Sequence, residues 1–298
     1  MIGNALFVLG GNDGEMEVIK QLLAIKGQSW VQPKMGWGDH IYTLVDLDLK
    51  AESQMIATGG GYGYHSGHDR EAQGIEGNPM IIFVECRPSD DWPVDHKPKV
   101  IDHHGERSGE PASVLQVLDL LMSEGMTRKV CGKPSSHTDE RRCLARQIST
   151  TTLRWVELVA ANDSGYIPAM RALGATIEEI ERVRALDRSA QGITLAQEAA
   201  AETALRSAIT DGRLTVVKLS HSKTAAVTDR LYGRYDQLLI LSENGEVNFY
   251  GDGALCALLK VKFEGWNGGS GLGKKGEDAF WGGYPTLDKV EQFIREQL

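Results

Sequence analysis

The segment Val100-Ile101-Asp102-His103-His104 places one carboxylate and two imidazoles in consecutive positions. A short apolar strand is predicted before them, and a helix opened by Pro111 is predicted after them. In a parallel α/β sheet this position lies at the carboxyl edge, where such proteins bind ligands. Imidazole and carboxylate together suit divalent transition metals such as Mn²⁺, Zn²⁺ or Fe²⁺. The alternative is a polar loop whose histidines contact only solvent.

Other acidic residues also follow predicted buried elements. Asp13 and Glu15 come just after the apolar run at 6–9, Glu85 ends a second apolar run, and Asp163 ends an apolar helix. A carboxylate at the end of a buried strand is costly unless it binds something. Carboxylates that meet at one rim would repel one another without a cation between them. Alternatively, Asp163 caps a helix and Glu15 favours a helix dipole.

The elements that would position these residues alternate between strand and helix in the first half of the chain. Apolar runs predict strands at 6–9, 41–45, 80–84 and 99–101, with helices at 16–25 and 111–121. Such alternation implies parallel pairing and an α/β sandwich.

The middle of the chain is predicted to be helical, and its last part is mixed. Helices are expected at 148–161, 176–186 and 194–209, with a break at the Gly-Tyr-Ile-Pro sequence 165–168 and a capping box from Thr194 to Gln197. Beyond residue 214, Asn244-Gly245 between two apolar runs predicts a hairpin. The expected fold class is therefore α/β, with a parallel-sheet core domain at 1–190, a helical linker at 191–212 and a smaller mixed α/β domain at 213–298.

The order of these motifs resembles the DHH phosphoesterases. An acid pair after the first strand, an acid after a later strand, Val-Ile-Asp-His-His and a helix leading into Asp-Ser-Gly carry the resemblance, which spans residues 1–171. That superfamily includes manganese pyrophosphatases, short-oligonucleotide exonucleases and cyclic-dinucleotide phosphodiesterases. Only Asp-His-His is a strongly specific element among these motifs.

The resemblance implies a site with two divalent ions, usually Mn²⁺, with Mg²⁺ as an alternative. By that similarity Asp102 supports the site and His104 contacts the scissile phosphate. The implied metal ligands are Asp13, Glu15, Glu85, His103 and Asp163, with Glu85 bridging the ions.

This chain departs from the family pattern at the first motif. Leu9 stands where the family has a histidine four residues before the first acid, and Glu15 and Glu85 stand where it has aspartates. Another group could replace the missing ligand, and the candidates are His40, His65 and His68, although each is more simply an ordinary loop residue.

The last domain resembles the small accessory domain, called DHHA1, that follows many DHH cores. Its expected substrate-binding residues are Gly268, Gly269, Lys274 and Lys275, in a segment at 265–283 with eight glycines. Glycines let backbone N–H groups approach phosphate, and Trp266 or Trp281 could stack on a base. The usual histidine after the glycines is absent, and a flexible surface loop is the alternative.

Composition limits the remaining classes of function. The net charge of −9 argues against a protein that coats duplex nucleic acid. The segment 128–154 is locally basic, and we interpret it either as a solvated loop or as a lid over an anionic substrate. No apolar run approaches the ~20 residues of a membrane span, and no secretion signal is visible. Cys131, His137 and Cys143 lack zinc-site spacing. A cytoplasmic protein is expected.

These observations predict a metal-dependent phosphohydrolase or phosphodiesterase. Its expected substrate is a nucleotide, a short oligonucleotide or a small phosphoanhydride. The expected partners are therefore small phosphorylated molecules or short single-stranded nucleic acid. No membrane association is expected, and a homodimer is possible. The alternative is a degenerate DHH-fold protein that binds or senses a nucleotide without turnover.

Overall fold

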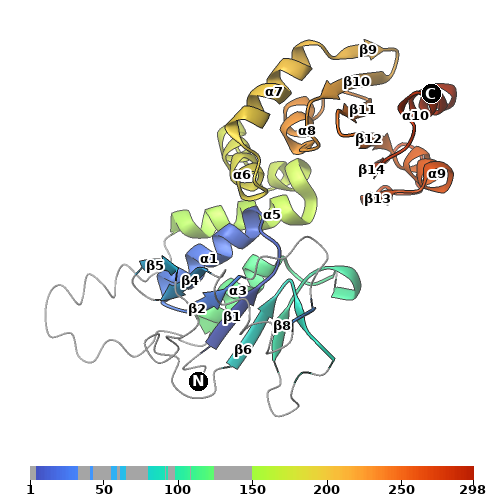
Figure 1. Ribbon diagram of the computed structural model, residues 1–298. Coiled ribbons are helices and arrows are strands. Elements are labelled where there is room, and N and C mark those ends of the chain that lie inside the picture. Colours follow the sequence, from blue (N-terminus) through green and yellow to red (C-terminus); the bar gives the residue numbers. More distant parts are fainter. Residues whose placement is uncertain are drawn as a thin grey trace, which may run out of the picture. The chain divides into compact units, whose positions relative to one another are not determined.

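The computed structural model describes residues 5–32, 41–42, 55–58, 61–64, 80–90, 92, 98–107, 109–123 and 150–298. The chain forms two compact units, Met1–Gln191 and Gly192–Leu298, and each is described here by itself (Figure 1). Several predicted positions lie outside the described residues: His40, His65, His68, Cys131, His137, Cys143 and most of the basic segment 128–154.

The first unit is built on a six-stranded sheet with the order β5-β4-β2-β1-β6-β8. Strands β2, β1, β6 and β8 are parallel to one another, whereas β4 and β5 are antiparallel additions next to β2. The strands are β1 (Ala5–Leu9), β2 (Ser29–Val31), β4 (Met55–Thr58), β5 (Gly61–Tyr64), β6 (Met80–Val84) and β8 (Lys99–Ile101). A separate two-stranded pair joins β3 (Ile41–Tyr42) to β7 (Arg87–Pro88).

The register of the parallel strands brings three chain segments to one edge of the sheet. Leu9 pairs with Val84, and Val84 pairs with Ile101, so β1, β6 and β8 end level with one another. The next backbone groups continue the alignment, because Gly10 donates to Val84 and Glu85 donates to Ile101, both at 2.9 Å. The residues that follow the three strands must therefore meet at the carboxyl edge of the sheet.

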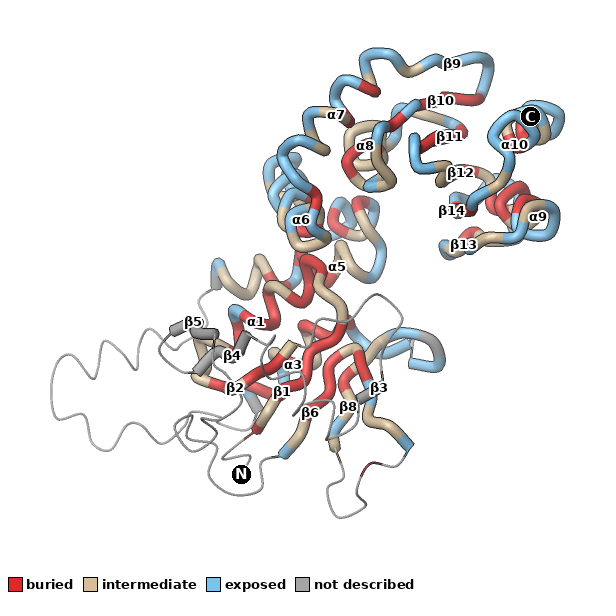
Figure 2. Tube along the Cα trace, in the orientation of Figure 1, coloured by how far each residue is buried: buried red, intermediate tan, exposed pale blue. Residues whose placement is uncertain are grey.

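Helices form a packed layer in the first unit. Among the described residues of this unit, the helices are α1 (Gly14–Lys26), α3 (Ser113–Ser123), α5 (Thr150–Ala172) and α6 (Ile177–Ala190), and the 3₁₀ turn η3 (Gly105–Arg107) precedes α3. Helix α1 contacts α3, α5 and α6. Most residues of α1, β1 and β6 are buried, as the red tube in Figure 2 shows.

Side chains alternate between the two faces of the central strands. Val8 and Phe83 point to the face opposite that of Phe7 and Leu9, and they pack against Cys86 and Trp92. Both faces of β1 and β6 are therefore buried, which explains why these strands are continuous apolar runs.

Helix α5 is interrupted where the Gly-Tyr-Ile-Pro sequence predicted a break. Gly165 and Tyr166 have non-helical backbone angles, and Tyr166 has a positive φ of 57°. Pro168 lies just beyond and cannot donate a backbone hydrogen bond. The kink begins two residues after Asp163, which lies inside the helix instead of capping one.

The second unit is a mixed sheet with the order β13-β14-β12-β11-β10-β9. The predicted hairpin is present, since β11 and β12 pair antiparallel around Gly245, whose φ is 86°. The strands are β9 (Ile209–Asp211), β10 (Leu214–Leu219), β11 (Gln237–Ser242), β12 (Val247–Asp252), β13 (Trp266–Gly268) and β14 (Asp278–Gly283).

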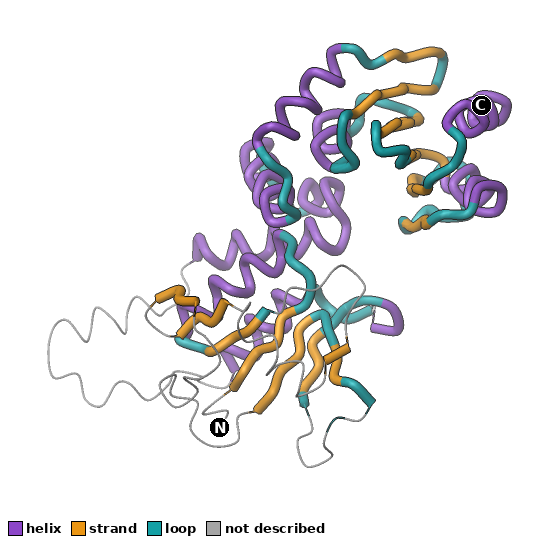
Figure 3. The backbone as a smooth tube through the Cα atoms, viewed as in Figure 1, coloured by secondary structure: helices purple, strands orange, loops and turns teal. Residues whose placement is uncertain are grey.

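Helices lie on both faces of this second sheet (Figure 3). One core contains residues of α9 (Gly253–Phe263) and α10 (Leu287–Gln297), and the other contains residues of α7 (Leu195–Arg206) and α8 (Ala225–Leu231). Helix α7 begins with the predicted capping box between Thr194 and Gln197. Ala201 and Ala204 bury its small-residue face in the second core.

The predicted fold class, a parallel-sheet α/β core and a smaller mixed α/β part, is confirmed. The boundaries proposed for a helical linker at 191–212 stay a prediction. Among the described residues, no helix is both long enough and apolar enough to cross a membrane.

Candidate metal centre

Four side chains from four different elements converge at the carboxyl edge of the first sheet. Glu15 lies in the first turn of α1, Glu85 follows β6, His103 follows β8, and Asp163 lies in α5. One potential ligand atom from each falls within 4.8 Å of every other. The sequence interpretation named all four residues, and the structure brings them together.

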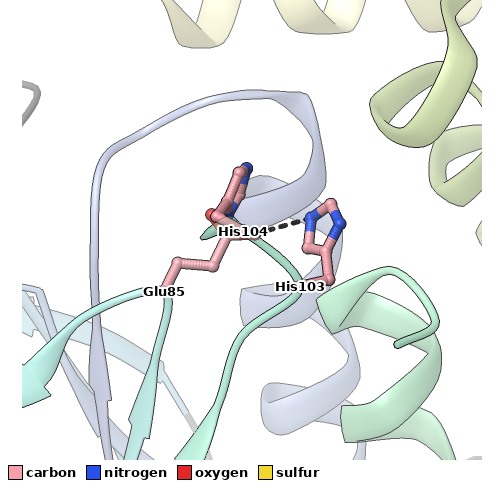
Figure 4. A group of neighbouring side chains, drawn as sticks. All are labelled: Glu85, His103 and His104. Carbon is pink, nitrogen blue, oxygen red and sulfur yellow. Dashed lines mark ion pairs between the residues drawn. The ribbon is translucent and has the colours of Figure 1, made fainter. Parts of the chain in front are cut away.

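The imidazole of His103 is at the centre of this group. Its Nε2 atom lies 2.7 Å from Oδ2 of Asp163, 3.3 Å from Oε1 of Glu85 and 3.8 Å from Oε2 of Glu15. Figure 4 shows the contact between Glu85 and His103 as a dashed line. The Asp163 carboxylate, followed by that of Glu85, raises the pKa of His103 to about 10.

The converging atoms are buried and lack ordinary hydrogen-bond partners. Oε2 of Glu15, Oε1 of Glu85, Nε2 of His103 and Oδ2 of Asp163 are each inaccessible to solvent and make no contact with hydrogen-bond geometry. Buried polar atoms normally have hydrogen-bond partners. Four neighbouring buried atoms without such partners therefore require another stabilising group. A divalent cation is such a group, because three carboxylate oxygens and one imidazole nitrogen are suitable ligands for it.

Glu15 is held in place by the start of α3. Its Oε1 accepts the Val114 backbone N–H at 2.8 Å, which leaves Oε2 directed toward His103. The first amides of a helix are otherwise unpaired and favour a negative charge. Burial, and then the neighbouring Glu85, raise the pKa of Glu15 far above its ordinary value. Such a carboxylate is expected to ionise only when a cation offsets its neighbours.

Glu85 occupies a strained backbone position directly after β6. Its φ is 55°, a left-handed value that non-glycine residues rarely adopt. Gly10 is needed beside it, because a Cβ at residue 10 would lie 2.5 Å from the Glu85 carbonyl oxygen. Burial alone raises the pKa of Glu85, but His103 and Glu15 outweigh burial and lower it to about 2. Strain of this kind is concentrated at functional sites.

Asp13 lies beside the group of four without joining it. It is the N-cap of α1, and its Oδ1 accepts the Met16 N–H at 2.8 Å. Burial, followed by the charge of Glu85, raises its pKa to about 7. Leu9, which stands where the family has a histidine, is fully buried in the core and offers no ligand.

Asp102 and His104 form a second, more exposed pair next to His103. Oδ1 of Asp102 accepts the His104 backbone N–H and lies 3.0 Å from His104 Nδ1. The His104 side chain is 59% exposed, and its ring centroid is 4.3 Å from that of His103. Asp102 thus orients His104, whose second nitrogen is left available to a ligand.

The glycine-rich segment of the second unit is organised around Asp252 and its own backbone. Asp252 accepts the Gly276 N–H at 2.7 Å, and Gly253 donates to Glu277. Lys274 pairs with Glu277, and both side chains are more than half exposed. Gly269 has a φ of 103°, and a Cβ at Gly268 would meet the Phe280 ring.

The two tryptophans of this segment have different environments. Trp281 is fully buried and donates to the Glu264 carbonyl, so the expectation that its indole could stack on a base was wrong. Trp266 is 42% exposed and packs edge-on against Tyr284 with ring centroids 5.9 Å apart. Only Trp266 of the two can offer a ring face.

The sequence interpretation missed the groups that hold the acidic residues in place. The Val114 amide and the Asp187 carboxylate contact Glu15 and Gly14 from distant parts of the chain. Gly10 and Gly14 are the local sequence features that could have indicated such contacts, because another segment of the chain approaches each of them closely. A glycine in the sequence does not show which segment approaches it.

No family model and no curated protein matches this chain. Among solved structures, a pGpG-specific phosphodiesterase, PggH from Vibrio cholerae, is 12% identical over 98% of both chains, with a TM-score of 0.40. The DHH domain of a member of the s1p family of ribosomal proteins is 11% identical over 99% of this chain and 87% of that one, with a TM-score of 0.45. Both structures are matched over nearly the whole length of this chain, and the resemblance to the DHH phosphoesterases rests on the sequence motifs.

Proposed function

We propose that this protein is a metal-dependent phosphoester hydrolase. The observation that carries the proposal is the convergence of four buried, unpartnered polar atoms from Glu15, Glu85, His103 and Asp163. Those four residues would hold one divalent ion, with Mn²⁺ preferred and Mg²⁺ as an alternative. Asp13, whose pKa already responds to Glu85, would contribute to a second ion.

The chemistry of the site follows from its donor set. Bound divalent ions supply Lewis acidity toward phosphoryl oxygens and lower the pKa of water. In the same site, Asp102 holds His104 by its Nδ1 atom, and the imidazolium form of His104 would present an Nε2–H donor to an equatorial phosphate oxygen. Such a fixed donor stabilises the charge that grows on these oxygens during transfer.

The second unit carries the proposed substrate-binding residues. Trp266 offers an exposed indole for stacking, and Lys275 lies near the anchored loop at Gly276. The substrate class we propose is a nucleotide, a short oligonucleotide or a small phosphoanhydride. A cytoplasmic location and a homodimeric state stay predictions.

The proposal is tested by turnover in the presence of Mn²⁺. The purified protein is assayed against pyrophosphate, linear dinucleotides including pGpG, cyclic dinucleotides and short single strands, with Glu85→Gln as the inactive control. We expect hydrolysis of at least one substrate, abolished by chelation and by the variant. If a nucleotide binds but no substrate is hydrolysed, the alternative of a nucleotide-binding sensor replaces this proposal.

A further inference from the structure

Helix α6 ends against the start of α1, between Asp13 and Glu15. The Asp187 side chain, which is buried, accepts the Gly14 backbone N–H through Oδ1 at 3.1 Å. The approach is close, since a Cβ at residue 14 would lie 3.1 Å from the Asp187 Cα. Gly14 is the first residue of α1, where backbone donors need a partner. Asp187 therefore fixes the backbone between the two acidic residues.

The other oxygen of the same carboxylate leads to Asp163. Oδ2 of Asp187 accepts from Arg184 Nη1 at 2.8 Å, and the same nitrogen donates to Asn162 Oδ1 at 2.9 Å. Arg184 is also buried, and its guanidinium lies 4.6 Å from the centre of the Tyr166 ring. A continuous chain of hydrogen bonds thus runs from Gly14, next to Glu15, to Asn162, next to Asp163.

The loop before α1 has a second tie to the end of α6. Asn12 donates from Nδ2 to the Ala190 carbonyl at 2.9 Å, and its Oδ1 accepts from the buried Lys20 at 2.6 Å. Gln191 donates to Oδ2 of Asp187 at 3.0 Å. Ala190 and Gln191 are the last residues of the first unit, so both ties lie where the chain passes into the second unit.

We propose that Asp187 is a positioning residue that sets the separation of Glu15 and Asp163, and that it links the unit boundary to the candidate metal centre. This inference rests on the proposed function. Groups that orient metal ligands from outside the coordination sphere are worth about ten- to hundredfold in metal affinity. Asp187 acts through the Gly14 amide and through Arg184, and it contacts none of the four cluster residues in the hydrogen bonds described.

The test compares Asp187→Asn with the wild type by titration calorimetry with Mn²⁺. Asparagine keeps an acceptor for Gly14 but presents donors to Arg184, so it should break the chain of hydrogen bonds while preserving size. We expect Mn²⁺ affinity to fall at least about tenfold. At saturating Mn²⁺ the kcat should largely return, because the reacting groups are intact.

The matched control on the same helix is Glu179→Gln. Glu179 pairs with Arg154 of α5 and caps α6, far along the helix from Asp187. This variant removes an ion pair between α5 and α6 without touching the loop, so its Mn²⁺ affinity should equal that of the wild type. If Asp187→Asn fails to fold, Asn162→Ala replaces it, with an expected loss of affinity of at least about threefold.

The outcomes separate this inference from the proposed function. Mn²⁺ binding by the wild type with an equal affinity in folded Asp187→Asn overturns the positioning role and leaves the proposed function standing. An equal loss in Glu179→Gln also overturns it, because the effect would then be general loosening of α6. Absence of Mn²⁺ binding in the wild type overturns both.

Discussion

Nε2 of His103 lies 2.7 Å from Oδ2 of Asp163, which joins the loop after β8 to the middle of α5. The contact lacks hydrogen-bond geometry, and both atoms are buried. An imidazole whose Nε2 carries no proton and a carboxylate at this distance present lone pairs to one another, which is unfavourable without a proton or a cation between them. The arrangement therefore favours either a proton on Nε2 of His103 or a bound metal.

The first prediction separates these two states by metal content. His103→Ala should bind Mn²⁺ more than about a hundredfold more weakly than the wild type, a greater loss than changes outside the coordination sphere cause. His221→Ala is the control, because His221 contacts the Gln197 carbonyl in the second unit. Elemental analysis after gel filtration in Mn²⁺ measures the effect. Equal metal content in the wild type, His103→Ala and His221→Ala would contradict a metal centre at His103.

The second prediction concerns the pH dependence of stability without metal. The folded pKa of Asp13 is raised to about 7, chiefly by burial and then by Glu85. The folded state therefore takes up a proton between its ordinary pKa of 3.8 and about 7, whereas the unfolded chain does not. Stability should rise as pH falls from about 7 to about 5 and decline as pH rises through that window. Glu15 acts in the same direction.

Glu85 has its effect below this window, and His103 has its effect mostly above it. The lowered pKa of Glu85 contributes stability above 4.5 that is lost only as pH falls through about 2. The raised pKa of His103 contributes stability below 6.5 that is lost as pH rises through about 10. Thermal unfolding at several pH values with EDTA, repeated with saturating Mn²⁺, is the measurement. Metal should invert the trend between pH 5 and 7, since ligands must lose protons to bind it; parallel curves would contradict the prediction.

The third prediction uses the strained backbone of Glu85. Glu85→Gly should relieve backbone strain of about 1 kcal/mol or more, because glycine accepts a positive φ. It also removes the stability that comes with the lowered pKa of Glu85. The free energy of unfolding of the metal-free protein should therefore change little, whereas Mn²⁺ binding should be abolished.

Glu264→Gly is its control, since Glu264 also has a positive φ, of 61°, but is exposed at the end of α9. It should relieve strain alone and leave Mn²⁺ affinity unchanged. Denaturant titration of both variants with EDTA measures the difference. A destabilised metal-free Glu85→Gly would show that Glu85 serves the fold instead of a cation.

The sequence predicted which residues meet at the sheet edge because strand endings are local features. An apolar run that stops at Leu9 or Val84 gives the strand, and parallel pairing then places Glu85 and His103 together. The same logic does not determine helix contacts. Asp163 reaches His103 only because α5 packs across α1 and α3, which depends on the shapes of many side chains.

Long-range partners of the acidic residues could not be predicted for a related reason. The Val114 amide that holds Glu15 and the Asp187 carboxylate that holds Gly14 come from segments with no local signal of the contact. The burial of Trp281 was missed because alternation along β14 decides which indole faces the core, and the glycine-rich sequence obscured that alternation. Strand register, not composition, sets that outcome.

The fourth prediction distinguishes His104 from the metal ligands. His104→Ala should lower kcat by about a hundredfold or more, within the range for loss of a positioned proton donor. Its Mn²⁺ content should stay that of the wild type, because His104 is exposed and paired with Asp102. Asp102→Asn should also lower kcat, by a smaller factor, because the His104 imidazole would no longer be held by a carboxylate. A fall in metal content in His104→Ala would instead make His104 a ligand.

The last prediction concerns substrate holding by the second unit, through Trp266. Its indole is 42% exposed, and stacking on a base is worth ~1–3 kcal/mol. Trp266→Ala should therefore raise KM for a nucleotide substrate at least about tenfold, a loss of ~1.4 kcal/mol. Hydrolysis of a minimal chromogenic phosphodiester, which has no base at the leaving-group end, should hardly change.

Tyr284→Phe is the control, because it removes the hydroxyl bonded to Glu246 but keeps the ring that packs against Trp266. Equal losses on both substrates in Trp266→Ala would mean that this indole supports the fold of the second unit, and the substrate-holding role would then be wrong.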